Sequence, residues 1–458
     1  MDKMAPMPGD LTIQQARLVL PDRCVTGDLL VRDGTIAVIA PRIDSPEGEV
    51  IDGRGLVCMP GAIDAQVRFR EPGETHKEDL RTGSRAAAAG GVTSFLDMPS
   101  VHPRTTTLEA LHDKLARAAE VCAVHYGFYL GATGDNVDEV ARAERACGIK
   151  VRLADDPSSL PDSESLAEVF GASVRPIALH PEDPARLASR RELYATSTDV
   201  ADHPRVHDVE SALIATQHAV RLAVKHGARL HLMHVSSEEE ADFLAEEAAD
   251  RITAGVCLHH LLLDAETAYA RLGTRVQCDP PIRSARHRDA LWRHLKAGTF
   301  SLVTSDHAPH SRDEKARPYP SSPSGLPGVE WLLPLLLDRV NAGACTLSDV
   351  ATWVCEGPAR TWGLRRKGRL EVGYDGDLVL IDMKAERVIT DASTRSKAGW
   401  SPWVGTAVQG WPVFTAILGE PVFRDGQVID GVRGSELTYR RLDAAHGGAG
   451  DSLRPWKV

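Results

Sequence analysis

The chain has 458 residues, of which 43% are hydrophobic and 26% are charged, and its formal net charge is −11. This composition is typical of a globular protein that buries a sizeable core. The acidic balance argues against a surface that binds nucleic acid or anionic membranes, because both need concentrated basic side chains.

Short strands are predicted near the N-terminus, where apolar runs alternate with turn residues. Asp33-Gly34 separates two of these runs and predicts a hairpin, because glycine adopts the positive φ that a tight turn needs. The predicted strands cover residues 11–14, 16–20, 27–32 and 33–39.

The segment from about 60 to 365 alternates short apolar strands with longer amphipathic helices, which is the pattern of parallel βα units. Its helices include residues 82–89 and 210–226, and Gly227 after the second is a typical helix end. The predicted strands are 63–70, 91–98, 125–130, 149–153, 176–180, 230–235, 252–257 and 301–306. Eight strands alternating with helices predict an α/β protein built on a (β/α)8 TIM barrel.

A second set of predicted strands lies near the C-terminus, at 376–382, 412–418 and 421–428. Because both ends of the chain are β-rich and the middle is not, we expect the two ends to build one small β-sandwich beside the barrel. The predicted division assigns residues 1–58 and 366–458 to the sandwich and 59–365 to the barrel.

Polar residues lie at the C-terminal ends of several predicted strands, which is where the active site of such a barrel is found. A single histidine in this position is more often structural than a ligand, and a lone lysine is usually solvated. The argument for a site therefore depends on the whole set. Its members are Lys150, His180, His234 and Asp306.

Several motifs along the chain point to one known family. They are Pro60–Gly73 ending in Arg-Glu-Pro-Gly, Thr75-His-Lys-Glu-Asp, Gly90-Gly-Val-Thr, Ser-Asp-His-Ala-Pro-His at 305–310, Leu326-Pro-Gly-Val-Glu and Gly399-Trp-Ser-Pro-Trp. In order and context, the chain resembles the dihydroorotase and cyclic-amidase branch of the metal-dependent amidohydrolases over nearly its whole length. The resemblance implies a barrel hydrolase that acts on cyclic amides.

The resemblance also implies a set of zinc ligands. In the family, the lysine equivalent to Lys150 is carboxylated and bridges two zinc ions, and the histidines equivalent to His180 and His234 hold the second ion. The aspartate equivalent to Asp306 binds the first ion and acts as general base.

Two further family ligands are missing, because the strand that reads Asp-x-His-x-His in the family carries Gln66 and Arg68 here. An amide is a poor zinc ligand, and a guanidinium has no lone pair to offer. We therefore expect one zinc ion, held by the lysine and the two histidines of the second position, or no metal at all. Arg68 is expected to pair with Asp306 or with a carboxylated Lys150, and so to replace the charge of the missing ion.

Candidate substrate contacts also follow from the resemblance. Arg70 and His310 match the family residues that hold the substrate carboxylate, and arginine suits bidentate carboxylate binding. The alternative is that Arg70 pairs only with Glu71 or Asp64.

Other pocket positions depart from the family pattern. Ser100 and Asp279 stand where the family has asparagine, in the second case usually, and Gly255 replaces a glutamate. We expect Ser100 and Asp279 to contact a substrate other than dihydroorotate. The negative charge of Asp279 favours a ligand with an amine or amide donor.

Further histidines in these motifs are predicted to be structural. Adjacent residues on a strand face opposite ways, so at most one of His259 and His260 can face the pocket. His307 is predicted to pack behind the site, and the loop 312–328, rich in Pro, Ser and Gly, is predicted to cover it.

Three functions are compatible with the sequence. The first is an enzyme that hydrolyses, or forms in reverse, a C–N bond of a small cyclic amide, imide or ureide bearing a carboxylate. The second is a catalytically inactive dihydroorotase homologue that serves as a scaffold for aspartate transcarbamoylase. The third is a metal-independent reaction in which Arg68 stabilises an oxyanion and Asp306 moves protons. Retention of the other ligands favours the enzyme.

Partners and location are predicted from composition and resemblance. Eight cysteines show no C-x-x-C spacing, and the first residues lack the apolar core of a signal peptide, so a reducing cytoplasm is expected. No apolar run is long enough to span a bilayer. A homodimer is expected because it is common in the family.

Overall fold

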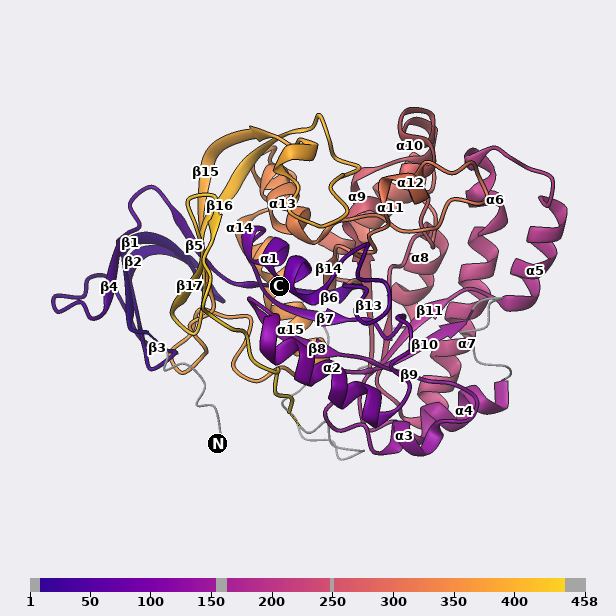
Figure 1. Ribbon diagram of the computed structural model, residues 1–458, viewed down its shortest axis with the longest axis horizontal. Coiled ribbons are helices and arrows are strands. Elements are labelled where there is room, and N and C mark those ends of the chain that lie inside the picture. The colour runs from indigo at the N-terminus through magenta and orange to yellow at the C-terminus, as the bar shows by residue number, and fades with distance from the viewer. Residues whose placement is uncertain (1–8, 154–162, 248–250, 441–458) are drawn as a thin grey trace.

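The computed structural model describes residues 9–153, 163–247 and 251–440. A barrel with helices around it forms one part of the molecule, and a sheet built from both ends of the chain lies beside it (Figure 1). The residues with chemistry predicted above belong to the barrel.

The barrel has eight parallel staves, as the sequence predicts. They are β6 (Ala62–Val67), β7 (Val92–Asp97), β8 (His125–Phe128) continued by β9 (Leu130–Gly131), β10 (Ile149–Leu153), β11 (Ile177–Pro181), β12 (Leu230–Leu232), β13 (Ile252–Cys257) and β14 (Leu302–Thr304). A parallel bridge between Val67 and His307 joins the last stave to the first and closes the barrel. The carboxyl ends of all eight staves therefore face one mouth.

Helices connect and cover the staves. They are α1 (Leu80–Ala89), α2 (Leu108–Val121), α3 (Val137–Ala141), α4 (Ser163–Ala172), α5 (Pro184–Leu193), α6 (His203–Val206), α7 (Val209–His226), α8 (Glu238–Glu246), α9 (Leu258–Leu262), α10 (Ala265–Leu272), α11 (Ala285–Lys296), α12 (Arg312–Lys315), α13 (Leu332–Asn341), α14 (Leu347–Ala351) and α15 (Gly357–Trp362). Asp79 caps α1 by accepting from Thr82 N. Gly227, with φ of 63°, ends α7 as predicted.

The terminal segments form one nine-stranded sheet. Its strands are β1 (Leu11–Val19), β2 (Cys24–Arg32), β3 (Thr35–Ala40), β4 (Glu49–Asp52), β5 (Val57–Pro60), β15 (Leu378–Val388), β16 (Ala407–Ile417), β17 (Glu420–Arg424) and β18 (Gln427–Val428). The hydrogen-bonded order is β18-β17-β16-β15-β5-β1-β2-β3, with β4 on β1. The two ends of the chain meet where β5 pairs with β15.

The local turn chemistry of this sheet follows the sequence. Asp33 and Gly34 have φ of 49° and 74° and form the predicted hairpin between β2 and β3. The strands predicted at 11–14 and 16–20 are one strand, interrupted by a bulge where Gln15 has φ of 55°.

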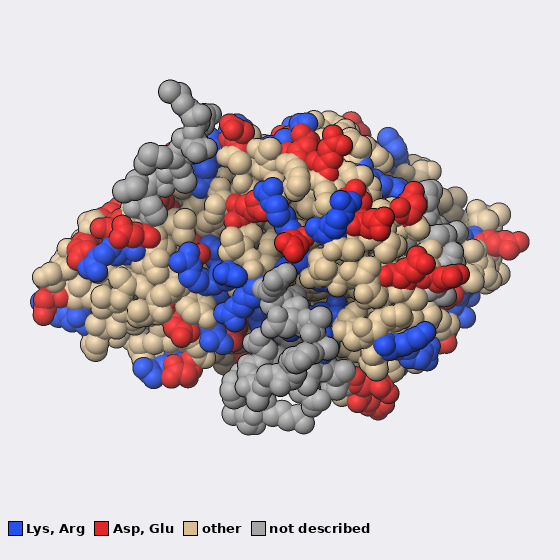
Figure 2. Space-filling view, turned by 90° about the horizontal axis from the view of Figure 1, so that it is seen from below, with Lys and Arg blue, Asp and Glu red and all other residues tan. Residues whose placement is uncertain are grey.

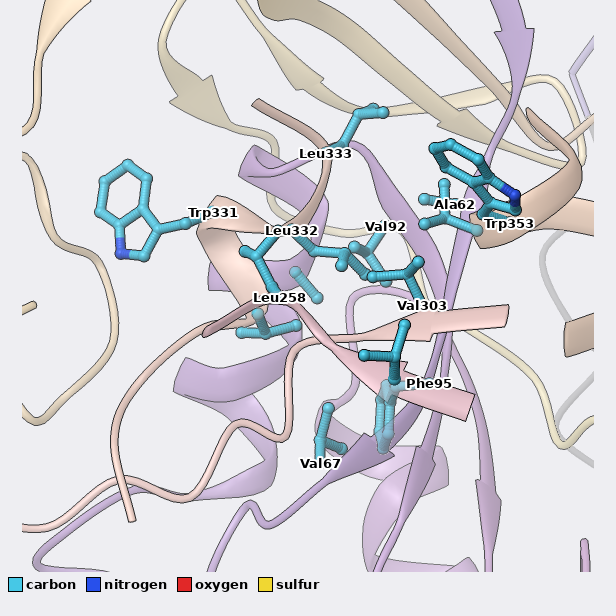
Figure 3. Packing of buried hydrophobic residues seen from close by; sticks show 14 of the residues in the cluster. Ala62, Val67, Val92, Phe95, Leu258, Val303, Trp331, Leu332, Leu333 and Trp353 are labelled. Carbon is cyan, nitrogen blue, oxygen red and sulfur yellow. The ribbon is translucent and has the colours of Figure 1, made fainter. Parts of the chain in front are cut away.

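Apolar cores lie in both the terminal sheet and the barrel. A small cluster fills the terminal sheet, with Leu29 and Val31 from one end of the chain and Leu380 and Phe414 from the other. The large cluster belongs to the barrel, and its members are seen in Figure 3, where Ala62, Val92 and Val303 come from three staves and Leu332 and Leu333 from α13. The same large cluster includes Val379, Ile381, Val408 and Trp411 of the terminal sheet, so the sheet and barrel share one core.

The surface carries charges of both signs. Basic and acidic side chains lie beside one another across the face shown in Figure 2. Among the helices in the part of the chain that the structure describes, none is both long and apolar enough to cross a membrane.

A buried ion pair links the sheet to the barrel. Asp377, just before β15, accepts from Lys367 Nζ at 2.6 Å and from Leu418 N at 3.0 Å, and its other contact is His125 of β8 at 3.3 Å. Burial opposes ionisation of Asp377, but Lys367 and His125 outweigh it and lower the pKa of the carboxyl.

Changing Asp377 to Asn is expected to lower the free energy of unfolding by about 1.5–3 kcal/mol at pH 7, because charged hydrogen bonds are lost. The folded-state pKa lies below the unfolded value, so this contribution is present above an unfolded pKa of about 3.9 and shrinks as the pH falls below it. Urea unfolding at several pH values measures the difference between the two proteins. Asp44→Asn, at an exposed pair with Arg42, is the control and should change stability by less than about 0.5 kcal/mol. A difference that does not narrow in acid contradicts the prediction.

Candidate active site

The structure brings the predicted strand-end residues together at the mouth of the barrel. Their proximity shows in their mutual electrostatic effects. The charge of Lys150 contributes to lowering the pKa of both His180 and His234. Arg68 in turn lowers the pKa of Lys150, and Asp306 raises it. Residues on or just after five different staves thus form one polar cluster in an apolar barrel.

His180 and His234 form the centre of this cluster. His180 Nδ1 lies 2.9 Å from His234 Nε2, and Glu182 Oε2 accepts from His180 Nε2 at 2.8 Å. Burial, with a further effect from Arg152, lowers the pKa of His180 to about 4. Burial, helped by the charge of His180, lowers the pKa of His234 well below its ordinary value. Both imidazoles are therefore neutral at pH 7, which is the form that binds metal ions.

Lys150 is held in an unusual state for a lysine. Its Nζ is buried and lies 3.0 Å from Met233 Sδ. Burial, with the nearby charges of Arg68 and Arg152, lowers the pKa of the amine well below its ordinary value. Lys150 is therefore far more readily neutral than an exposed lysine.

Arg68 and Asp306 form an ion pair, which is one of the two pairings expected for Arg68. Arg68 Nη1 donates to Asp306 Oδ1, and the two side chains are only 13% and 6% exposed. Burial by itself raises the pKa of Asp306, but Arg68 and then His259 outweigh it and lower the pKa below the usual value. Asp306 is thus ionised at neutral pH.

Three of the site residues have strained backbones. Arg70, His234 and Asp306 have φ of 61°, 40° and 46°, in the left-handed region that side-chain-bearing residues rarely adopt. Such conformations cost about 1–3 kcal/mol each and are maintained by the surrounding structure, often at functional sites. The strain places the three side chains in the barrel mouth at points where a regular strand would turn them elsewhere.

Arg70 and His310 lie together, as the resemblance implies. Arg70 Nη2 is 3.0 Å from His310 Nε2, and Arg70 Nε donates to Pro309 O at 3.1 Å. The alternative prediction, that Arg70 pairs with Glu71 or Asp64, is wrong. The carboxylate nearest to Arg70 is that of Glu74, whose Oε2 lies 3.5 Å from Arg70 Nη1. Glu71 instead accepts from Leu80 N, and Asp64 accepts from Ser305 N.

The predicted substrate contacts that depart from the family differ in their surroundings. Ser100 is exposed on the loop after β7. Asp279 accepts from Ser324 Oγ at 3.0 Å and lies 2.9 Å from His203 Nε2, so its carboxylate already has partners. At Gly255, a Cβ would lie 2.8 Å from Leu302 Cδ1, so the barrel here has closed over the position of the family glutamate.

The histidines of the remaining motifs lie around the site. His259 and His260 are in α9, not on a strand, so the argument from strand alternation is wrong. His260 Nε2 contacts Pro280 O at 3.0 Å, whereas neither nitrogen of His259 has a hydrogen-bond partner among the described residues. His307 lies behind the site, where its Nδ1 accepts from Gly328 N at 3.0 Å.

The loop 312–328 packs against the site as predicted. Lys315 Nζ donates to Gln277 O at 3.1 Å and to Pro323 O at 2.8 Å, and Ser324 O lies 3.1 Å from His310 Nε2. The loop therefore packs against His310, the neighbour of Arg70.

Three residues of the network were not predicted from the sequence. Glu182 Oε1 lies 2.7 Å from His207 Nδ1, and His207 is followed in the network by Asp279 and His203. A signal was present in the spacing of His203 and His207, which places both on one face of a helical turn.

The spacing of His180 and His234 fits one zinc ion. Two nitrogens bound to one tetrahedral zinc ion at about 2.0–2.1 Å lie about 3.3 Å apart, close to the 2.9 Å between His180 Nδ1 and His234 Nε2. At the strand that carries the substituted family ligands, Arg68 pairs with Asp306, and Gln66 Nε2 is buried with no hydrogen-bond partner among the described residues. A guanidinium has no lone pair to offer a metal ion.

Comparisons with known proteins extend over nearly the whole chain. A family model described as the amidohydrolase family matches residues 57–158 and 178–422. A dihydroorotase of Methanothermobacter thermautotrophicus is 33% identical over 445 residues, which covers 96% of this chain and 100% of the relative. An allantoinase of Rubrobacter xylanophilus is also 33% identical and covers 91% and 95%. A solved structure of an L-hydantoinase (dihydropyrimidinase) from Arthrobacter aurescens has a TM-score of 0.89 at 28% identity and covers 94% and 100%.

Proposed function

The chain belongs to the amidohydrolase family, and from this premise we propose that it hydrolyses a C–N bond of a small cyclic amide, imide or ureide bearing a carboxylate, or forms that bond in reverse. The observation that carries the proposal is the neutral His180–His234 pair together with an ionised Asp306, both of which interact electrostatically with Lys150. A pair of metal-binding nitrogens and a general base are the two parts that such a hydrolysis needs.

Each residue has a proposed role. One zinc ion bound by His180, His234 and a carboxylated Lys150 would polarise the amide carbonyl and lower the pKa of water. The readily neutral amine of Lys150 supports carboxylation, because only the neutral form reacts with carbon dioxide. Asp306 accepts a proton from the attacking water and delivers it to the leaving nitrogen.

Two arginines complete the site. Arg68 keeps Asp306 ionised and supplies the positive charge of the missing ion, but not its Lewis acidity. Arg70, with His310 beside it, binds the substrate carboxylate, and the bidentate geometry of the guanidinium orients the ring. Ser100 and Asp279 are proposed to line the outer part of the pocket.

The test of the zinc site is His234→Ala in the full chain, purified without chelator. We expect the variant to hold one zinc ion less than the unchanged protein, by elemental analysis, and to hydrolyse its preferred substrate at least about 100-fold more slowly. The substrate panel is dihydroorotate, allantoin, 5-substituted hydantoins with a carboxylate, and dihydropyrimidines. The matched control is His294→Ala, in α11, whose ring pairs with Asp242 at the surface.

Two outcomes contradict parts of the proposal. Equal zinc content in both proteins, with activity present, excludes this zinc site and leaves the metal-independent reaction of Arg68 and Asp306. No activity on any substrate, with zinc bound, excludes the enzyme and leaves the inactive scaffold, which co-purification with aspartate transcarbamoylase would then test.

We also propose that the protein is a homodimer in the cytoplasm. All eight cysteines are free, and six of them are buried, which supports a reducing compartment. Light scattering tests the dimer against the chain mass of 49.6 kDa.

A further inference from the structure

We propose that His203, His207 and Asp279 form a second binding site for a divalent transition-metal ion, apart from the His180–His234 position. The site shares Asp279 with the outer part of the proposed substrate pocket, but the proposed hydrolysis uses no metal ion at this position, and the site is argued from its own contacts. Among the described residues, each of the three offers one ligand atom, and these atoms all lie within 4.8 Å of one another.

The two histidines are presented by one helical turn. His203 begins α6 and His207 follows one turn later, so both rings lie on the same face with centroids 4.6 Å apart. Asp279 approaches them from the loop after residue 276. Its Oδ1 is 2.9 Å from His203 Nε2 and 3.7 Å from His207 Nε2. These two distances bracket the separation of about 3.3 Å expected between ligands on one tetrahedral ion.

The nitrogen orientations suit a metal ion. Glu182 Oε1 lies 2.7 Å from His207 Nδ1, so Nδ1 donates to the carboxylate and Nε2 is the nitrogen that faces Asp279. A carboxylate behind the histidine is the usual arrangement at metal sites, because it fixes the ring and its tautomer. His203 Nε2 lies 2.9 Å from Asp279 Oδ1 and 3.0 Å from Cys278 O, so without metal it donates a hydrogen to these oxygens, and a bound metal ion would displace that proton.

The surroundings leave one side of the cluster open. His203 and His207 are 3% and 4% exposed, whereas the side chain of Asp279 is 20% exposed. Asp279 also accepts from Ser324 Oγ, and its second oxygen is 4.0 Å from Arg152. Two imidazoles and one carboxylate suit zinc and its neighbours in the first transition row, and three protein ligands leave a position for water.

One carboxylate joins the two histidine pairs. Glu182 Oε1 contacts His207 and Glu182 Oε2 contacts His180, so the same buried side chain orients a ligand at each position. The chain therefore lacks the two family histidines, which are replaced by Gln66 and Arg68. It has other histidines nearby, since Glu182 connects His180 to His207. The competing explanation is a hydrogen-bonded network that holds a proton and no metal.

The test is a titration of the chelator-stripped full chain with Co2+, followed by visible absorption and by counting bound ions. The variants are His203→Gln and Asp279→Asn, and His234→Ala removes the other position. The control is His294→Gln, because His294 Nε2 lies 2.9 Å from Asp242 Oδ1 and reproduces one histidine–aspartate pair without a third ligand. Circular dichroism shows that each variant is folded, and Asp279→Asn keeps the size of the side chain.

The unchanged protein is expected to bind one ion more than His203→Gln or Asp279→Asn, with at least about a 100-fold loss of affinity at that site. His234→Ala should retain the absorption band that these two variants lose. If Asp279→Asn and His203→Gln bind as many ions as the control with the same spectrum, the site does not exist. His234→Ala tests the proposed catalytic zinc site, whereas His203→Gln and Asp279→Asn test the second site. The experiment can therefore contradict one proposal and leave the other standing.

Discussion

Asp306→Asn is expected to lower kcat on the preferred cyclic amide by about 100- to 10,000-fold, the range for loss of a general base. Asp306 is ionised and lies at the end of the last stave, paired with Arg68. Asparagine keeps the shape but cannot accept a proton. Steady-state kinetics should show the loss in kcat more than in KM, because the carboxylate of the substrate is bound elsewhere, by Arg70.

Asp64→Asn provides the comparison for this variant. Asp64 is also a buried carboxyl at the barrel mouth, but burial raises its pKa to about 7 and its partner is Ser305. An amide therefore removes less charge there, and we expect kcat to fall by less than about tenfold. Equal losses in the two variants would mean that Asp306 supports the fold and is not the base.

The second large effect is expected at Glu182. Glu182→Gln should lower the free energy of unfolding by about 3–5 kcal/mol, the cost of removing one partner from a buried charged network. Glutamine can accept from one imidazole, but its amide group then faces the N–H of the other. Urea unfolding of the metal-free chain measures the loss. In the metal titration, the same variant should weaken binding by about 10- to 100-fold at both histidine positions.

Glu240→Gln is the matched control. Glu240 is as buried as Glu182, but burial raises its pKa, and its partners are Ser236, Ser237 and Thr216. An amide keeps an oxygen that accepts from these donors, and burial already opposes the charge of Glu240, so the expected loss is below about 1 kcal/mol. If Glu182→Gln and Glu240→Gln lower the free energy of unfolding equally, the loss at Glu182 comes from changing a buried carboxyl and not from its contacts with two histidines.

The fold was predictable because its signals are local. The alternation of apolar strands and amphipathic helices predicted all eight staves, and Asp33-Gly34 predicted a hairpin. Both predictions use hydrophobic periodicity and turn-forming residues, which can be recognised within a few neighbouring positions of the sequence. The predicted end of a strand was wrong where a tertiary contact, and not the local sequence, ends that strand. The alternation continues to residue 70, but β6 ends at Val67, and Arg68 N donates to His307 O instead.

The candidate site was predictable only where a motif marked it. Lys150 and His180 lie on β10 and β11, and His234 and Asp306 follow β12 and β14 by two residues, so barrel geometry brings them together. The partners of Asp279 had no such signal, because His203 lies 76 residues away on a short helix whose position depends on packing. The same holds for Arg70, whose nearest carboxylate depends on the left-handed turn at residue 70.

The pairing of β5 with β15 sets the order in which this chain can fold as it is synthesised. The N-terminal strands β1 to β5 pair among themselves early, but the other edge of β5 has no partner until Leu378 leaves the ribosome. At about 5–20 residues per second, the intervening 300 or so residues take roughly 15–60 s. During that time an apolar strand edge is open to other nascent chains, which is the usual starting point of aggregation. Yield in a cell should therefore depend on translation speed and chaperones more than the stability of the finished protein suggests.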